Sequence, residues 1–135
     1  MKQKYIVGDV VMYDNKIMVI KEPRDGSHFD LSCPKEGLVY CFVGVEDIKP
    51  VVLTPEILEK NRWRTQNRWY YYLDVTEGFI SYIGIDFKHK SNKGHLYVEV
   101  DGNNMVEIQY CHELQHFLFG LGINYEMGVY VCCML

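Results

Sequence analysis

The stretch from residue 7 to residue 20 reads VGDVVMYDNKIMVI, and it decides the fold class of the chain. Two runs rich in β-branched and aromatic residues flank Asp14-Asn15, a pair that tolerates the positive φ angles of a tight turn. The pattern therefore predicts a β-hairpin. Similar apolar runs recur along the chain, which has 14% aromatic residues and no alanine, the best helix former. This composition favours β structure throughout.

Around this hairpin, the first half of the chain alternates short strands with loops. Turn-rich segments at residues 22–27 and 33–37 precede a compact strand at residues 38–43. Several short strands that close within about fifty residues are typical of a small SH3-like barrel. We therefore expect an SH3-like small β-barrel over residues 1–52.

The second half, residues 53–135, predicts an α+β module. Thr54 is a suitable N-cap and Pro55 fits the first helical position, which indicates a linker helix at about residues 54–61. An antiparallel sheet is expected at about residues 69–109, a helix at about 110–121, and then a C-terminal strand. The fold class is thus α+β, mostly β: an N-terminal SH3-like small barrel followed by an antiparallel meander packed on one helix.

Two segments carry a resemblance to a known family. Residues 48–61 read IKPVVLTPEILEKN, and residues 110–122 read YCHELQHFLFGLG. Together they resemble a family of small uncharacterised proteins encoded by gut bacteria and their phages or mobile elements, over nearly the whole chain. The resemblance implies the same two-part architecture and no particular reaction. This chain departs from the family pattern at Arg62-Trp63, where a glycine and an aromatic residue are usual.

Composition and charge restrict the classes of function. The 135 residues are 48% hydrophobic and 24% charged, as in ordinary globular proteins, and no apolar run approaches the length of a membrane span, about eighteen residues. We expect a cytoplasmic protein whose five cysteines are mostly reduced core residues. The net charge of −4 is unevenly distributed: residues 60–95 carry a net +4, whereas residues 96–135 contain no Lys or Arg.

The second predicted helix contains the sequence His112-Glu113-Leu114-Gln115-His116, which matches the HExxH pattern. In zinc hydrolases of this pattern, two histidines one turn apart bind the metal and the glutamate activates a water molecule. A helical wheel places the apolar residues on one face and both histidines almost opposite, facing solvent or a cleft. The predicted buried positions on the apolar face are Leu114, Leu118 and Leu121.

A catalytic zinc also needs a third protein ligand, and the sequence does not identify one. Residues after the motif offer only Glu126, Cys132 and Cys133, without the spacing of the common metallopeptidases. Upstream candidates are His28, His89 and His95. In the resembling family other polar residues occupy the positions of Glu113 and His116, which favours a solvent-facing structural helix.

A second candidate site lies in the basic middle of the chain. Arg62, Trp63, Arg64 and Arg68 interleave charges with aromatic rings just before a run of three tyrosines. Arginines can neutralise phosphates and aromatic rings can stack on bases, as in single-strand nucleic-acid binders. In a strand, however, alternate aromatic side chains are core residues and the others cover the sheet surface, and the acidic C-terminal part weakens any attraction for nucleic acid.

The sequence thus favours a non-enzymatic accessory or interaction module without a cofactor. Its partner is unknown, with a protein favoured over nucleic acid or membrane. One alternative is a zinc metallopeptidase with His112 and His116 as ligands and Glu113 as general base. Another is a weak binder of single-stranded nucleic acid through the Arg/aromatic segment.

Overall fold

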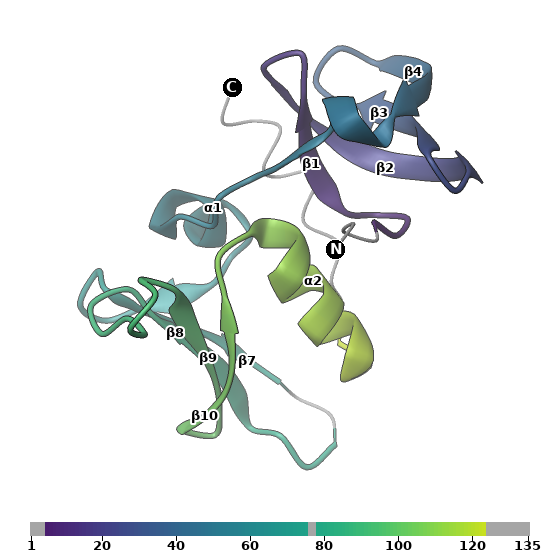
Figure 1. The fold of residues 1–135 in the computed structure, drawn as a ribbon. Coiled ribbons are helices and arrows are strands. Elements are labelled where there is room, and N and C mark those ends of the chain that lie inside the picture. The colour runs from purple at the N-terminus through teal and green to yellow at the C-terminus, as the bar shows by residue number, and fades with distance from the viewer. Residues whose placement is uncertain (1–4, 76–77, 124–135) are drawn as a thin grey trace. The chain divides into compact units, whose positions relative to one another are not determined.

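The chain folds into two antiparallel sheets and one main helix (Figure 1). This computed structural model describes residues 5–75 and 78–123, and it is mostly β, with 46% strand and 16% helix. The chain divides into two compact units. The first combines residues 1–52 with residues 110–135, and the second comprises residues 53–109.

The first unit contains a five-stranded sheet in the order β4-β3-β2-β1-β5. The predicted hairpin is confirmed: β1 pairs with β2, and the turn residues Asp14 and Asn15 have φ angles of 52° and 59°. A short 3-10 helix, η1 at Val45–Asp47, follows β4. The strand bounds are β1 Val10–Tyr13, β2 Lys16–Asp25, β3 His28–Cys33, β4 Leu38–Gly44 and β5 Lys49–Pro50.

One face of this sheet forms the core of the first unit. The side chains of this face alternate along β2 and β3, as in any strand, and Val10 and Ile17 are buried on the opposite face. Cys33 belongs to this core, as predicted for a reduced core cysteine, whereas Cys41 is exposed. The buried cluster consists of Tyr5, Val11, Met18, Ile20, Phe29, Leu31, Cys33, Val43 and Ile48.

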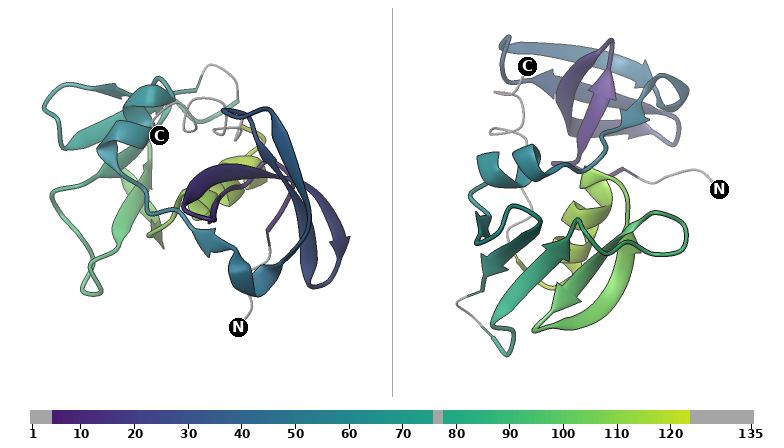
Figure 2. Two further views of the ribbon diagram at one scale, coloured as in Figure 1. Left: turned by 90° about the horizontal axis from the view of Figure 1, so that it is seen from above. Right: turned by 90° about the vertical axis from the view of Figure 1, so that its left-hand side faces the viewer.

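The second unit begins with the linker helix α1, Pro55–Lys60. The hydroxyl of Thr54 accepts a hydrogen bond from the Ile57 N–H, and Pro55 occupies the first turn, in agreement with the sequence. An antiparallel meander follows in the order β10-β9-β8-β7-β6 (Figure 2). Its strands are β6 Arg64–Thr65, β7 Tyr70–Asp74, β8 Tyr82–Asp86, β9 Leu96–Val100 and β10 Asn103–Ile108.

The faces of this meander differ in burial. Tyr71 and Ile85 pair across β7 and β8, and both are buried. Tyr70 and Tyr72 point to the opposite face and are only partly buried. The expectation that alternate aromatics of this segment are core residues is therefore confirmed.

The main helix, α2 at Cys111–Gly120, belongs to the first unit, whereas the sequence assigned it to the second. It packs near β1, and the buried Gln115 holds it there. Gln115 Oε1 accepts a hydrogen bond from the Val10 N–H, and Gln115 Nε2 donates one to the Gly8 carbonyl, both at 2.8 Å. A helical wheel identifies the apolar face but not the element that the polar side chains bind. The expected C-terminal strand lies outside the described residues.

Candidate functional site

The HELQH motif lies on α2, and its glutamate has a local structural role. The carboxylate of Glu113 accepts a hydrogen bond from the Tyr110 N–H at 2.9 Å, at the N-terminus of the same helix. This is the arrangement in which the third residue of a helix caps its first turn. A negative charge at this position is also stabilised by the helix dipole. The residue that would be the general base therefore has a capping function.

His112 is buried, contrary to the prediction that it faces solvent. Only 3% of the residue is exposed, and its ring lies edge-on to Tyr5 at 5.2 Å and parallel to Tyr110 at 5.9 Å. Burial lowers the pKa of His112 to about 4, with a smaller contribution from His116. The imidazole is therefore neutral at pH 7. Its Nδ1 atom is buried without a hydrogen-bond partner among the residues that the structure describes.

His116 pairs with a residue that the sequence analysis missed. Its Nε2 atom lies 2.7 Å from Oδ2 of Asp9, a carboxylate that is completely buried. The Ile6 N–H also donates to Asp9 Oδ2, at 2.9 Å. Burial raises the pKa of Asp9, although both of these contacts act in the opposite direction. The only signal for Asp9 in the sequence was a charged residue directly before the first apolar run of the hairpin.

Glu113, Gln115 and His116 are thus bound within the first unit, whereas His112 is buried among aromatic rings. Within residues 5–75 and 78–123, no group of three or more His, Cys, Asp or Glu residues is arranged to hold a metal ion. The proposed third ligands have other neighbours: Asp25 for His28, Asp86 for His89 and Glu107 for His95. Glu126, Cys132 and Cys133 lie outside the described residues.

The Arg/aromatic segment also has internal contacts. Trp63 is buried, with 6% exposure, so it is a core residue and not a stacking surface for bases. Arg64 forms an ion pair with Asp74 at 3.0 Å, and its guanidinium lies over the ring of Tyr72. Arg62 and Arg68 occupy turn positions with φ angles of 67° and 70°. The structure therefore does not bring the four residues together as one basic, aromatic surface.

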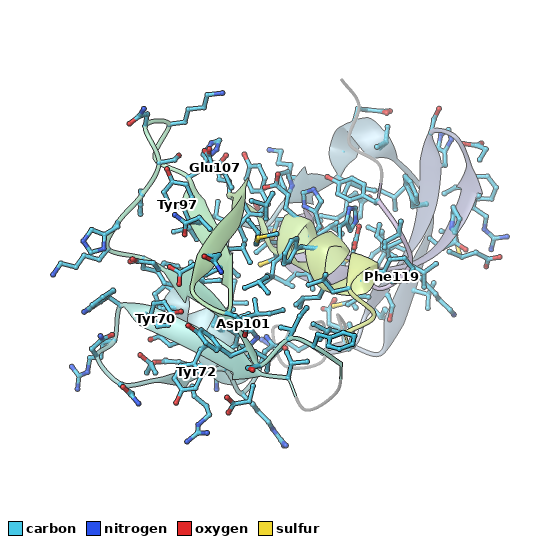
Figure 3. The ribbon with its side chains drawn as sticks, turned by 90° about the horizontal axis from the view of Figure 1, so that it is seen from below. Tyr70, Tyr72, Tyr97, Asp101, Glu107 and Phe119 are labelled. Atoms are coloured by element: carbon cyan, nitrogen blue, oxygen red, sulfur yellow. The ribbon has the colours of Figure 1, made fainter. Side chains whose placement is uncertain are left out.

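A pocket of about 410 Å³ opens on the exposed face of the second sheet. The register places Tyr72 opposite Gly84 and Asp74 opposite Tyr82, so these residues share that face. Figure 3 shows the side chains of Tyr70 and Tyr72 next to each other there. The lining consists of three tyrosines, two amides and one carboxylate: Tyr70, Tyr72, Tyr82, Gln66, Asn67 and Asp74.

An unusual exposed aromatic residue lies on β4, at the edge of the first sheet. Phe42 is 60% exposed, and its backbone has a φ angle of 54°. The carboxylate of Asp30, which is buried, accepts a hydrogen bond from the Phe42 N–H at 3.0 Å. Asp30 also accepts one from Arg24 Nε at 2.7 Å, and the Arg24 guanidinium lies 5.5 Å from the centre of the Phe42 ring.

Sequence reasoning placed Phe42 in a strand and did not single it out. The sheet register shifts between Phe29 and Leu31, so Asp30 lies at a bulge opposite the residues before Val43. The hydrogen bond from Arg24 holds the pKa of Asp30 below its ordinary value. No local signal marked Asp30 as buried, because a charged residue between two apolar ones is the ordinary pattern of a strand with one solvated face.

Comparison with protein-family models, with curated proteins and with solved structures finds no match for this chain. The resemblance to the family of gut bacteria and their phages stays a prediction. In the part of the chain that the structure describes, no helix is both long and apolar enough to cross a membrane.

Proposed function

We propose that this protein is a non-enzymatic accessory module of the cytoplasm that binds a partner protein through the edge of its first sheet. In this proposal the first half is an SH3-like barrel. The occupant of the site is one extended segment of the partner, which pairs with β4 and packs against Phe42. The single observation that carries the proposal is the exposed Phe42, fixed in a left-handed backbone conformation by the buried carboxylate of Asp30, which also pairs with the exposed Arg24.

The conformation of Phe42 has an energetic cost. A left-handed residue other than glycine costs about 1–2 kcal/mol, and a bulky side chain adopts this conformation rarely. Burying the Asp30 carboxylate costs further free energy, which Arg24 and the Phe42 N–H offset. Strained residues held by their surroundings occur most often at functional sites. The strain here presents an aromatic ring to solvent beside an arginine, and arginine is one of the residues that are enriched at binding hot spots.

In the part of the chain that the structure describes, the strand that carries Phe42 has a partner on one side only. β4 is the last strand in the order of its sheet, and its sequence, LVYCFVG, contains no charged residue and no proline. Natural proteins normally protect edge strands with such residues. Leu38 and Val39 on the same strand are 50% and 45% exposed. An apolar, unprotected edge of this kind is the surface that strand addition uses.

The test uses two substitutions on β4 and one control. Phe42→Asn removes the ring and keeps a residue that tolerates positive φ, whereas Val39→Lys places a charge on the edge. Phe79→Asn is the control, because Phe79 is fully exposed and belongs to the second unit. Proteins captured by the wild-type chain from cells that naturally produce it are compared with those captured by each variant, and each captured partner is then purified.

The expected result is one partner that the wild-type and Phe79→Asn proteins bind and the two β4 variants do not. Hydrogen exchange of the purified complex should then show new protection of the β4 amides. Equal binding by the Phe42→Asn protein would contradict the proposal. So would a dimer of this chain alone that Val39→Lys dissociates, because the edge would then serve self-association.

A further inference from the structure

The pocket on the exposed face of the second sheet has an unusual lining. Its volume of about 410 Å³ is within the range of small-molecule sites, about 300–1,000 Å³. Most such sites are lined mainly by aliphatic and aromatic side chains. Here the lining contains no aliphatic residue, and aromatic rings alternate with amide and carboxylate groups. The pocket therefore combines flat apolar surfaces with many hydrogen-bonding atoms.

Tyr70, one part of the aromatic wall, is fixed before any ligand arrives. The hydroxyl of Tyr70 donates a hydrogen bond to Glu99 Oε1 at 3.0 Å. Its ring lies over Gly84, where a Cβ atom would collide with the Tyr70 hydroxyl. Asn67 Oδ1 accepts hydrogen bonds from the N–H groups of Trp69 and Tyr70, at 3.3 and 3.0 Å. A wall that is held in this way loses little conformational entropy when it binds a ligand.

The charge of the pocket excludes some classes of ligand. None of the six lining residues is a cation, and one of them, Asp74, is a carboxylate that forms an ion pair with Arg64 at 3.0 Å. A phosphate group would therefore meet a negative charge in the lining itself, which argues against nucleotides and nucleic acids. A neutral ligand with several hydroxyl groups meets no such repulsion. Its hydroxyls can donate to a carboxylate or an amide oxygen and accept from an amide N–H.

We propose that this pocket binds a neutral saccharide, with the ring of Tyr72 as its stacking surface. The C–H face of a sugar ring packs on an aromatic ring, while hydroxyl groups at its edge bond to Gln66 and Asp74. Tyr72 is partly exposed on the pocket side of β7. The Arg64 guanidinium lies over one face of its ring, 5.6 Å from the centroid, so the sugar packs on the opposite face. The inference goes beyond the proposed protein-binding function, because it rests on different residues in the other unit.

The test is a titration of isotope-labelled protein with neutral oligosaccharides, followed by NMR. The probes are maltohexaose, cellohexaose, xylohexaose and mannohexaose. We expect at least one of them to shift the amide signals of residues 66–74 and 82. Tyr72→Ala should weaken that binding by about tenfold or more, whereas Tyr72→Phe keeps the ring and should retain it.

Two further variants separate the pocket from the rest of the sheet. Tyr97→Ala is the matched control, because Tyr97 pairs with Asp86 on the same face but does not line the pocket. Its binding should equal that of the wild-type protein. Gly84→Ala should weaken binding by displacing Tyr70.

Two outcomes would overturn the inference. One is the absence of any shift with all four sugars at millimolar concentration. The other is binding of oligothymidylate or a proline-rich peptide that depends on Tyr72 when no sugar binds. Either outcome leaves the proposed binding of a partner protein to β4 unaffected, because the Phe42→Asn variant tests a surface of the other unit.

Discussion

The polar side chains of α2 and those of the pocket on the second sheet serve opposite purposes. On α2, Glu113 caps its own helix, Gln115 binds the backbone of residues 8 and 10, and His116 pairs with Asp9. In the pocket, Gln66 and Asp74 lie at the surface beside half-buried tyrosines. Three of the four polar residues of the recognisable catalytic motif are thus bound within the fold, and the fourth, His112, is buried. The pocket keeps Gln66 and Asp74 at the solvent, although Asp74 also pairs with Arg64.

A short sequence motif does not by itself establish a catalytic site. HExxH specifies residue types and their spacing, but chemistry also requires that the side chains can reach a metal and a substrate. Capping, ion pairing and backbone hydrogen bonds compete for the same atoms. The following predictions test whether α2 is structural, in order from the largest expected effect to the smallest.

The largest effect should come from the apolar side of α2. Leu114 and Leu118 are buried, with exposures of 0% and 1%, so truncating either to alanine should lower the free energy of unfolding by about 2–5 kcal/mol. Leu121 was also predicted to be buried, but it is 40% exposed. Leu121→Ala is therefore the control and should change stability by less than about 0.5 kcal/mol. Urea denaturation of the three variants measures this, and equal losses at all three positions would refute the assignment.

Helices and strands that are defined by patterns over a few neighbouring residues were predictable from the sequence. The hairpin at residues 7–20, the linker helix and the meander follow from alternation and from turn or cap residues that act over a few positions. The pairs that define the sites were not predictable. His116 and Asp9 are 107 residues apart, and no local pattern reports such a contact. His112 was misplaced because a helical wheel treats histidine as polar, whereas a neutral imidazole packs well against Tyr5 and Tyr110.

The burial of His112 should appear in the pH dependence of stability. Its pKa is about 4 in the folded protein and about 6.5 in an unfolded chain, so protonation favours unfolding. Stability should therefore be fully present above pH 6.5 and fall as the pH decreases toward 4. One group contributes at most about 1.4 kcal/mol per pH unit.

The control for this effect is His112→Phe, which keeps an aromatic ring and removes the titration. Its stability should vary less between pH 6.5 and 4, and at pH 5 it should exceed that of the wild-type protein. Asp9 has the opposite effect on the pH dependence of stability. Because its pKa is raised in the folded protein, the folded state binds a proton at a higher pH than the unfolded state, so Asp9 favours folding as the pH decreases. Identical pH profiles for the two proteins, measured by thermal unfolding, would show that His112 is not buried as described.

The smallest effect should come from Glu113 and from zinc. A glutamine at this position keeps an oxygen that can accept the Tyr110 N–H, so Glu113→Gln should change the free energy of unfolding by less than about 0.5 kcal/mol. The same substitution removes the carboxylate that a zinc hydrolase needs as its general base. Added zinc should leave the melting temperature of the wild-type protein unchanged.

The zinc measurement is sensitive enough to contradict this expectation. A metal at a hundred times its dissociation constant stabilises the folded state by about 2.7 kcal/mol, which a thermal melt resolves easily. Metal analysis of the purified protein provides the second readout. A zinc ion that copurifies with each chain, and that is lost in a His116→Ala protein, would mean that the histidine leaves Asp9 for the metal. The histidine pair of α2 would then be a metal site, and the contact at 2.7 Å between His116 and Asp9 would exist only in the metal-free protein. The contrast between a structural α2 and a ligand-binding pocket would then be wrong.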